Sequence, residues 1–191
     1  MQLFGSVASP YVRRLRLLLA TQPYEFVALN IFESSGRATL VEHNPARKVP
    51  VLVDGGQHVF DSNVIYRYLA QKLNLTPLSW PEENTLTLIN AVNDSLVELL
   101  LCQRSGLDTS EDKLFFNLQH ERITACLDAL NEQVKLGGFA RWDYLAMSLY
   151  TLVDWLEFRK LADLKPYSAL RQFVLQHQQQ PAVAETDPRL S

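Results

Sequence analysis

The chain has 191 residues, of which 47% are hydrophobic and 20% are charged, a composition typical of a globular protein long enough to bury its own core. Its two cysteines, Cys102 and Cys126, are too few for a disulfide framework and show no metal-ligand spacing. The net charge of −3 divides into +3 over residues 1–77 and −6 over residues 78–191. The positive excess is too small for general nucleic-acid binding, but it suits a small anion.

No apolar run in the sequence approaches the roughly 20 residues that span a membrane. Arg13, Arg14 and Arg16 interrupt the first apolar stretch, which a secretory signal peptide would need intact. We therefore expect a cytoplasmic protein with neither a membrane nor a nucleic acid as partner.

The first half of the sequence alternates short strand signals with helical ones. Strands are predicted at residues 2–4, 24–30, 49–53 and 58–60, and helices at 10–21, 38–43 and 63–73. A helix between the first two strands predicts a parallel, right-handed crossover, whereas Asp54-Gly55 between the last two is typical of a hairpin. This order of elements predicts an α/β layered fold.

The second half of the sequence is helical. The stretch 74–84 contains Pro77 and Pro81 and no periodicity, which predicts a linker. Helices are predicted after it at residues 85–103, 110–136, 143–158 and 166–179, and the polar tail from Pro181 is expected to be loosely packed. The predicted domains are residues 1–77 and 85–191, with 78–84 as the linker.

Ser9 lies at the turn between the first strand and the first helix, immediately before Pro10. A hydroxyl at a helix N-terminus meets free backbone N–H groups and the positive end of the helix dipole. Such an environment stabilises a bound thiolate and lowers its pKa. Serine is also a preferred N-cap residue, so plain capping is the alternative role of Ser9.

Two further features open predicted elements. Val49-Pro50 begins a strand; proline at such a turn is often cis, and an extended Val49 leaves its backbone open to a peptide-like ligand. Asp61-Ser62 opens a helix and places a carboxylate beside an anion site. An ordinary edge strand and an ordinary cap are the alternatives.

Cations occur near the same predicted edge of the sheet, at Arg37, Arg47 and Lys48. Exposed cations are commonly just solvated. Together, however, an anion site, a partner for an ammonium group and open backbone fit one ligand, the tripeptide glutathione.

The first half of the chain resembles the N-terminal, thioredoxin-like domain of the cytosolic glutathione S-transferases. The matching segments are residues 5–14, 44–52 and 60–65. The length, the linker and the all-helical second half resemble the family too, and the Ser-Pro-Tyr turn is most similar to that of bacterial members. The resemblance implies a thioredoxin-like α/β domain followed by an all-α domain, the glutathione S-transferase fold.

This resemblance assigns a catalytic role to Ser9, which corresponds to the catalytic serine of the plant tau-like classes and to a cysteine in the omega- and beta-like classes. It implies that the Ser9 hydroxyl donates a hydrogen bond to the sulfur of glutathione and holds the thiolate. If Ser9 is only a cap, Ser6 or Tyr11 is the next candidate.

The resemblance also implies a set of glutathione-binding residues. Val49, before a cis Pro50, would pair its backbone with the cysteinyl part of the ligand. Asp61, in place of the family's usual glutamate, would face the γ-glutamyl ammonium group, and Ser62 would bind the neighbouring carboxylate. Either of two cations would bind the glycyl carboxylate, namely Arg37 or Lys48.

The resemblance further implies a site for the acceptor substrate and a second subunit. The acceptor would lie between the domains, against residues Tyr11, Leu99, Cys102 and Gln103. A homodimer is expected, with contacts from Tyr66 and the first long helix of the second domain.

Two features depart from the family pattern. The Ser-Pro-Tyr turn has no cysteine and the chain has no CxxC motif, which disfavours mixed-disulfide and disulfide oxidoreductase chemistry. Asp143 and Ala146 stand where the family has a capping box, so the reciprocal half of the box is missing and a modest loss of stability is expected.

The sequence therefore favours a detoxifying glutathione transferase that conjugates electrophiles or reduces peroxides. It would use glutathione as a co-substrate, with no metal or other cofactor. The alternative is a non-catalytic glutathione-binding or protein-interaction module, because a fold alone does not establish catalysis.

Overall fold

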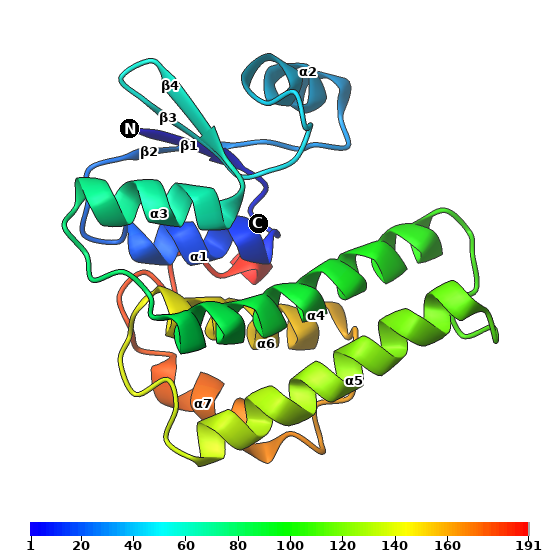
Figure 1. Ribbon diagram of the computed structural model, residues 1–191. Coiled ribbons are helices and arrows are strands. Elements are labelled where there is room, and N and C mark those ends of the chain that lie inside the picture. The colour runs from blue at the N-terminus through cyan, green and yellow to red at the C-terminus, as the bar shows by residue number, and fades with distance from the viewer. Residues whose placement is uncertain (191) are drawn as a thin grey trace. The chain divides into compact units, whose positions relative to one another are not determined.

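The structure is a computed structural model that describes residues 1–190, and the chain divides into two compact units (Figure 1). The first unit is Met1–Pro77 together with the C-terminal segment that begins at Gln178, and the second unit is Leu78–His177.

The first unit is built on a four-stranded mixed sheet of order β2-β1-β3-β4. Its strands are β1 (Gln2–Gly5), β2 (Glu25–Ala28), β3 (Val51–Asp54) and β4 (Gln57–Phe60). β1 pairs in parallel with β2, while β3 runs antiparallel to both β1 and β4. This is the predicted combination of a crossover and a hairpin.

Helices cover both faces of this sheet (Figure 1). They are α1 (Pro10–Leu18), α2 (Ser34–His43) and α3 (Ser62–Lys72). α1 packs beside α3, whereas Leu40 of α2 packs with Phe4 and Val51 in a separate apolar cluster. Because side chains alternate along a strand, the fully buried Leu3 and Leu52 face the opposite side of the sheet from Phe4 and Val51.

The second unit is all-helical, as predicted. It contains α4 (Trp80–Arg104), α5 (Leu114–Lys135), α6 (Tyr144–Arg159) and α7 (Ser168–His177). α4 packs on α5 and α6, and α7 packs on α5 and α6. α6 is buried along almost its whole length, from Tyr144 to Leu156, so it forms the core of the unit.

α4 is the one helix within residues 1–190 that is long and apolar enough to meet the criterion for a membrane span. Its apolar side chains form a buried stripe at helical spacing, comprising Leu86, Ile89, Val92, Leu96 and Leu99. This stripe packs inside the chain, and a single helix that meets the criterion is weak evidence for a membrane.

The predicted linker, residues 78–84, differs from the structure because α4 already begins at Trp80. Proline is tolerated in the first helical turn, where its missing N–H needs no partner, and Pro81 occupies that turn. The backbone N and Oγ of Ser79 both donate to Glu82 Oε2, each at 2.7 Å, which closes the helix N-terminus.

The predicted C-terminal boundary, with residues 85–191 in one helical domain and a loose tail, also differs from the structure. The described part of the tail belongs to the first unit and ends in the short 3-10 helix η1 (Pro188–Leu190). Val183 and Thr186 are only 4% and 3% exposed. The tail is polar in composition, but Val183, Thr186 and Pro188 are buried, so this segment is not loosely packed.

Candidate functional site

The strand register brings three of the predicted site features to one end of the sheet. Phe4 of β1 is in register with Val51 of β3, which is in register with Phe60 of β4. The segments that carry Ser9, Val49 and Asp61 follow β1, precede β3 and follow β4, respectively. Since β3 is antiparallel to its neighbours, these three segments lie at the same end of the strands, hereafter the sheet edge.

Ser9 is the N-cap residue of α1. Its backbone is extended (φ −82°, ψ 124°), and its Oγ accepts a hydrogen bond of 3.4 Å from Val12 N. The cap uses a lone pair of the hydroxyl oxygen, whereas binding a thiolate uses the O–H hydrogen. Among the described residues the Ser9 hydroxyl donates no hydrogen bond. Capping and thiolate binding are therefore compatible roles.

Gly5 allows α1 to begin close to the end of β1. A Cβ at this position would lie 2.5 Å from Val12 Cγ2, far inside van der Waals contact. The lack of a side chain at Gly5 thus sets the approach of the first turn of α1, and with it the place of Ser9 at the sheet edge.

The segment before β3 is organised by Asn44, a buried residue for which the sequence indicates no role in the site. Asn44 Nδ2 donates to Lys48 O at 2.7 Å, and Asn44 Oδ1 accepts from Ala46 N at 2.9 Å. Arg47 N donates to Asn44 O at 2.9 Å. These bonds close a turn directly before Val49; the Asn44-Pro45 pair is a turn signal in the sequence, but the sequence does not show what the turn supports.

Val49 follows this turn, and the Val49–Pro50 peptide bond is cis, as predicted. Within the described residues Val49 makes no hydrogen bond. Its backbone N–H and C=O thus lie without protein partners at the sheet edge, which is the arrangement that pairs with an extended peptide ligand.

Asp61 and Ser62 open α3. Asp61 has a positive φ of 73°, and its Oδ1 accepts from Asn63 N at 2.9 Å and from Val64 N at 3.1 Å. Both capping bonds use Oδ1, so Oδ2 of this exposed carboxylate has no hydrogen bond within residues 1–190. Ser62 is only 3% exposed. The carboxylate and the helix N-terminus thus lie together, as predicted.

Arg37 lies on α2, and Lys48 lies in the turn before β3. Both side chains are exposed, and neither forms an ion pair with another described residue. Either cation is therefore available to a carboxylate, and the choice between them stays open.

The residues predicted to line an acceptor site fall in both units. Tyr11 of α1 is half-buried, with the Arg14 guanidinium 5.0 Å from the centre of its ring. On α4, Leu99 is buried and Cys102 is half-buried, while Gln103 Nε2 donates to Thr109 Oγ1 at 2.9 Å. This set of residues stays a prediction.

Tyr66 and Cys126 are both buried. Tyr66, expected at a subunit contact, is 4% exposed and its hydroxyl donates to Thr76 O at 3.4 Å, so its side chain is buried within this chain. Cys126 is buried, and burial raises the pKa of its thiol, as expected of a core cysteine. The described residues contain no group of three or more His, Cys, Asp or Glu side chains that could hold a metal ion.

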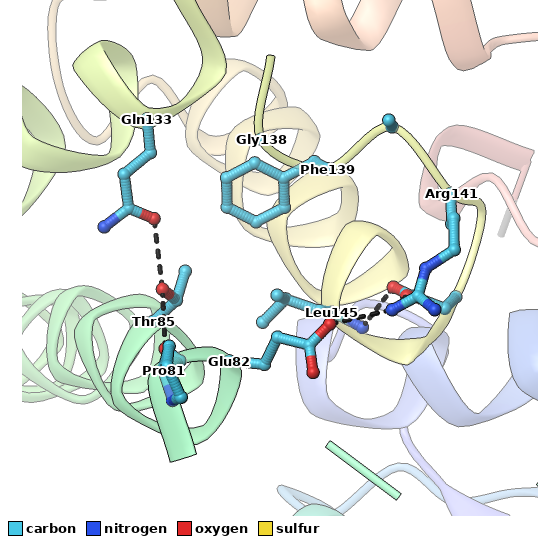
Figure 2. A pocket seen from close by; sticks show the side chains of 10 residues that line it. Pro81, Glu82, Thr85, Gln133, Gly138, Phe139, Arg141 and Leu145 are labelled. Atoms are coloured by element: carbon cyan, nitrogen blue, oxygen red, sulfur yellow. Dashed lines mark hydrogen bonds and ion pairs between the residues drawn. The ribbon is translucent and has the colours of Figure 1, made fainter. Parts of the chain in front are cut away.

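A cavity of about 260 Å³ lies within the helical unit, beside the N-termini of α4 and α6 (Figure 2). Thr85 Oγ1 donates to Gln133 Oε1 at 3.1 Å on one side of it. On the other side Arg141 Nη2 bridges Glu82 Oε1 at 2.8 Å and Asp143 Oδ2 at 3.3 Å. These polar groups satisfy one another, so the cavity carries no clear site chemistry.

Asp143 is the N-cap residue of α6. Its Oδ1 accepts from Leu145 N and Ala146 N, each at 3.1 Å. The bridge from Arg141 to Glu82 ties this cap to the N-terminus of α4. That bridge joins residues 59 positions apart, and no local sequence signal indicates it.

Comparison with known proteins places the first unit in a defined family. The family model for the glutathione S-transferase N-terminal domain matches residues 3–77. The uncharacterized GST-like protein YibF of Escherichia coli K12 is 31% identical over 175 residues, which cover 85% of each chain. Glutathione S-transferase U9 of Arabidopsis thaliana is 37% identical over 84 residues, 42% of this chain and 34% of that protein.

Solved structures with this fold extend the likeness to the whole chain. A glutathione S-transferase from Methylobacillus flagellatus, crystallised with glutathione bound, superposes with a TM-score of 0.84. The alignment covers 97% of this chain and 98% of that chain at 18% identity. At that identity the likeness establishes the fold, an α/β thioredoxin-like domain followed by a helical domain.

Proposed function

Because the chain belongs to the glutathione S-transferase superfamily, we propose that it binds glutathione at the sheet edge formed by the ends of β1, β3 and β4. Ser9 donates a hydrogen bond to the sulfur and stabilises the thiolate. The thiolate then attacks an electrophile or reduces a peroxide.

The observation that carries this proposal is the state of the Ser9 hydroxyl. Its oxygen accepts only a long bond from Val12 N, and its hydrogen has no acceptor within the described residues. The hydroxyl lies at the N-terminus of α1, where the helix dipole favours an anion. Stabilising the thiolate by these fixed dipoles makes the thiol a stronger acid without a general base.

The peptide part of glutathione is held by groups around Ser9. The unpartnered backbone of Val49, next to Pro50, pairs with the cysteinyl residue. Asp61 Oδ2 accepts from the γ-glutamyl ammonium group, and Ser62 at the N-terminus of α3 binds the γ-glutamyl carboxylate. Arg37 or Lys48 binds the glycyl carboxylate.

The conjugation step balances without a cofactor. The thiol of bound glutathione releases its proton to solvent, and the thiolate sulfur forms a bond to the electrophilic carbon. With an aryl halide, the carbon–halogen bond breaks and halide leaves with the electron pair. Tyr11, Leu99, Cys102 and Gln103 are the proposed contacts of the acceptor.

Two measurements separate this function from its alternative. Retention on immobilised glutathione together with conjugation of an aryl halide supports a transferase. Retention without turnover of aryl halides, epoxides or peroxides supports a glutathione-binding module instead. If the folded protein is neither retained on glutathione nor active on any of these substrates, the proposed glutathione site is rejected.

We also propose that the protein is a homodimer in the cytoplasm. The burial of Tyr66 removes one of the two contacts expected from the sequence, so the subunit contact rests on α4. Light scattering that gives the mass of one chain, 21.8 kDa, would reject the dimer.

A further inference from the structure

The C-terminal segment packs against α1 through an arginine that is almost completely buried. Arg13 is 4% exposed, although a charged side chain is rarely buried unless it is paired. Its Nε donates to Thr186 Oγ1 at 3.2 Å and its Nη2 donates to Val183 O at 3.1 Å. The two acceptors lie about 170 positions away in sequence but in the same compact unit.

The acceptors are held in a rigid turn. Thr186 N and Thr186 Oγ1 both donate to Ala182 O, at 3.0 and 2.7 Å, and Val183 N donates to Gln180 O at 3.2 Å. The Asp187 carboxylate follows Thr186. Burial opposes its charge, but hydrogen bonds from Arg189 and the nearby charges of Arg189 and Arg13 together lower its pKa. The positive charge of Arg13 thus has a nearby negative counterpart.

The backbone of Arg13 connects this contact to Ser9. Arg13 N donates to Ser9 O at 3.0 Å, which closes the first turn of α1. Val12 N, the neighbouring donor, bonds Ser9 Oγ. Arg13 therefore binds the C-terminal segment through its side chain and Ser9 through its backbone N–H.

We propose that Arg13 is a positioning residue for Ser9, and that the C-terminal segment 178–190 is the brace that holds it. This inference rests on the proposed function of Ser9. A guanidinium is required because its Nε and Nη2 reach two acceptors in a fixed geometry, which an ammonium group does not reproduce. Loss of either acceptor loosens the first turn of α1 and displaces the Ser9 hydroxyl from the sulfur.

The test removes one acceptor without changing shape. Thr186→Val replaces the hydroxyl with a methyl group, and Thr186→Ser restores the oxygen while lacking the threonine methyl. Thr124→Val is the matched control, because Thr124 Oγ1 also donates to the carbonyl four residues earlier, at 3.0 Å, but on the exposed side of α5.

Glutathione conjugation gives the first readout. Because small displacements of catalytic groups are costly, we expect Thr186→Val to lower kcat by roughly tenfold. The KM for glutathione should stay within about twofold, and the pKa of the bound thiol, followed by thiolate absorbance, should rise. Thr186→Ser and Thr124→Val should behave as the wild type does. Equal losses in Thr186→Val and Thr186→Ser, or none in either, would overturn the proposal.

Amide hydrogen exchange gives a second readout that needs no activity. Thr186→Val should speed exchange at Val12 and Arg13, the two donors to Ser9, and Thr124→Val should not. Unchanged exchange at both amides overturns the brace even if conjugation is observed. Absence of conjugation in the wild type would instead reject the proposed function, while the exchange result still decides whether the brace exists.

Discussion

At the scale of single residues, the site depends on side chains that use one atom for structure and leave another for a ligand. Ser9 Oγ accepts a capping bond and keeps its hydrogen, and Asp61 caps α3 with Oδ1 and keeps Oδ2. In both, the helix N-terminus that needs the cap is also the positive end of a dipole that favours an anion. Capping and binding therefore select similar residue types, which is why sequence alone leaves both roles open.

Substitution of Ser9 separates the two roles. Ser9→Ala removes both cap and donor and should lower conjugation at least about tenfold, at a stability cost of about 1 kcal/mol. Ser9→Asp keeps an acceptor for Val12 N but cannot donate to a thiolate and adds a like charge, so it should be stable and inactive. Steady-state kinetics and urea unfolding measure the two effects. Full turnover in Ser9→Ala would leave Ser9 as a cap and point to Ser6 or Tyr11.

Asn44 should control binding and not the chemical step. Asn44→Asp preserves volume and the acceptor for Ala46 N, but it places an oxygen opposite Lys48 O, where Nδ2 now donates at 2.7 Å. Breaking a buried hydrogen bond costs about 1–3 kcal/mol, so the KM for glutathione should rise about tenfold or more while kcat changes little. Asn84→Asp, an exposed position, is the charge-matched control. A fall in kcat at unchanged KM would contradict this role.

At the scale of elements, local periodicity and turn signals predict most of both units, because these signals depend only on residues close together in the sequence. The same signals mispredict the start of α4, since Pro81 is compatible with a first helical turn as well as with a linker. Ser9, Val49 and Asp61 are predictable because each lies at the end of an element. Asn44 marks a visible turn, but its hydrogen bonds decide the conformation before Val49 and cannot be inferred from spacing.

The N-terminus of α4 should make stability depend on acidity. Hydrogen bonds from Ser79 N and Oγ, helped by Arg141, lower the pKa of Glu82 despite its partial burial. A lowered pKa means that the ionised carboxylate stabilises the fold above the ordinary glutamate pKa of about 4.3, and that this contribution disappears as pH falls through the lowered value.

Glu82→Gln should therefore destabilise the protein by about 1 kcal/mol at pH 7, the usual scale for a lost cap, and by less below about pH 4. Glu83→Gln, in the same helical turn, is the control for removing a negative charge near the helix N-terminus. Urea unfolding at the two pH values measures the difference. Equal effects of Glu82→Gln and Glu83→Gln at neutral pH would show that the bonds to Ser79 contribute nothing.

At the scale of the whole molecule, residues 1–77 and 178–190 lie in the same unit, and the sequence does not reveal this. In the sequence, Arg13 is one of several cations on a predicted amphipathic helix, and the polar tail from Pro181 has no periodicity. Their contact depends on a pairing across some 170 positions, and such long-range pairings leave no local signal. The helical unit is therefore inserted between two parts of the first unit, instead of following it.

Removal of the residues from Gln178 onward tests that organisation. It should leave the buried helix α6 protected, because α6 packs within residues 78–177, and it should loosen α1, because Arg13 loses the acceptors Val183 O and Thr186 Oγ1. Hydrogen exchange should thus rise in α1 and stay unchanged in α6. Removal from the exposed Leu190 onward is the control, since it keeps both acceptors. If exchange rose in α6 and not in α1, the C-terminal segment would belong to the helical unit after all.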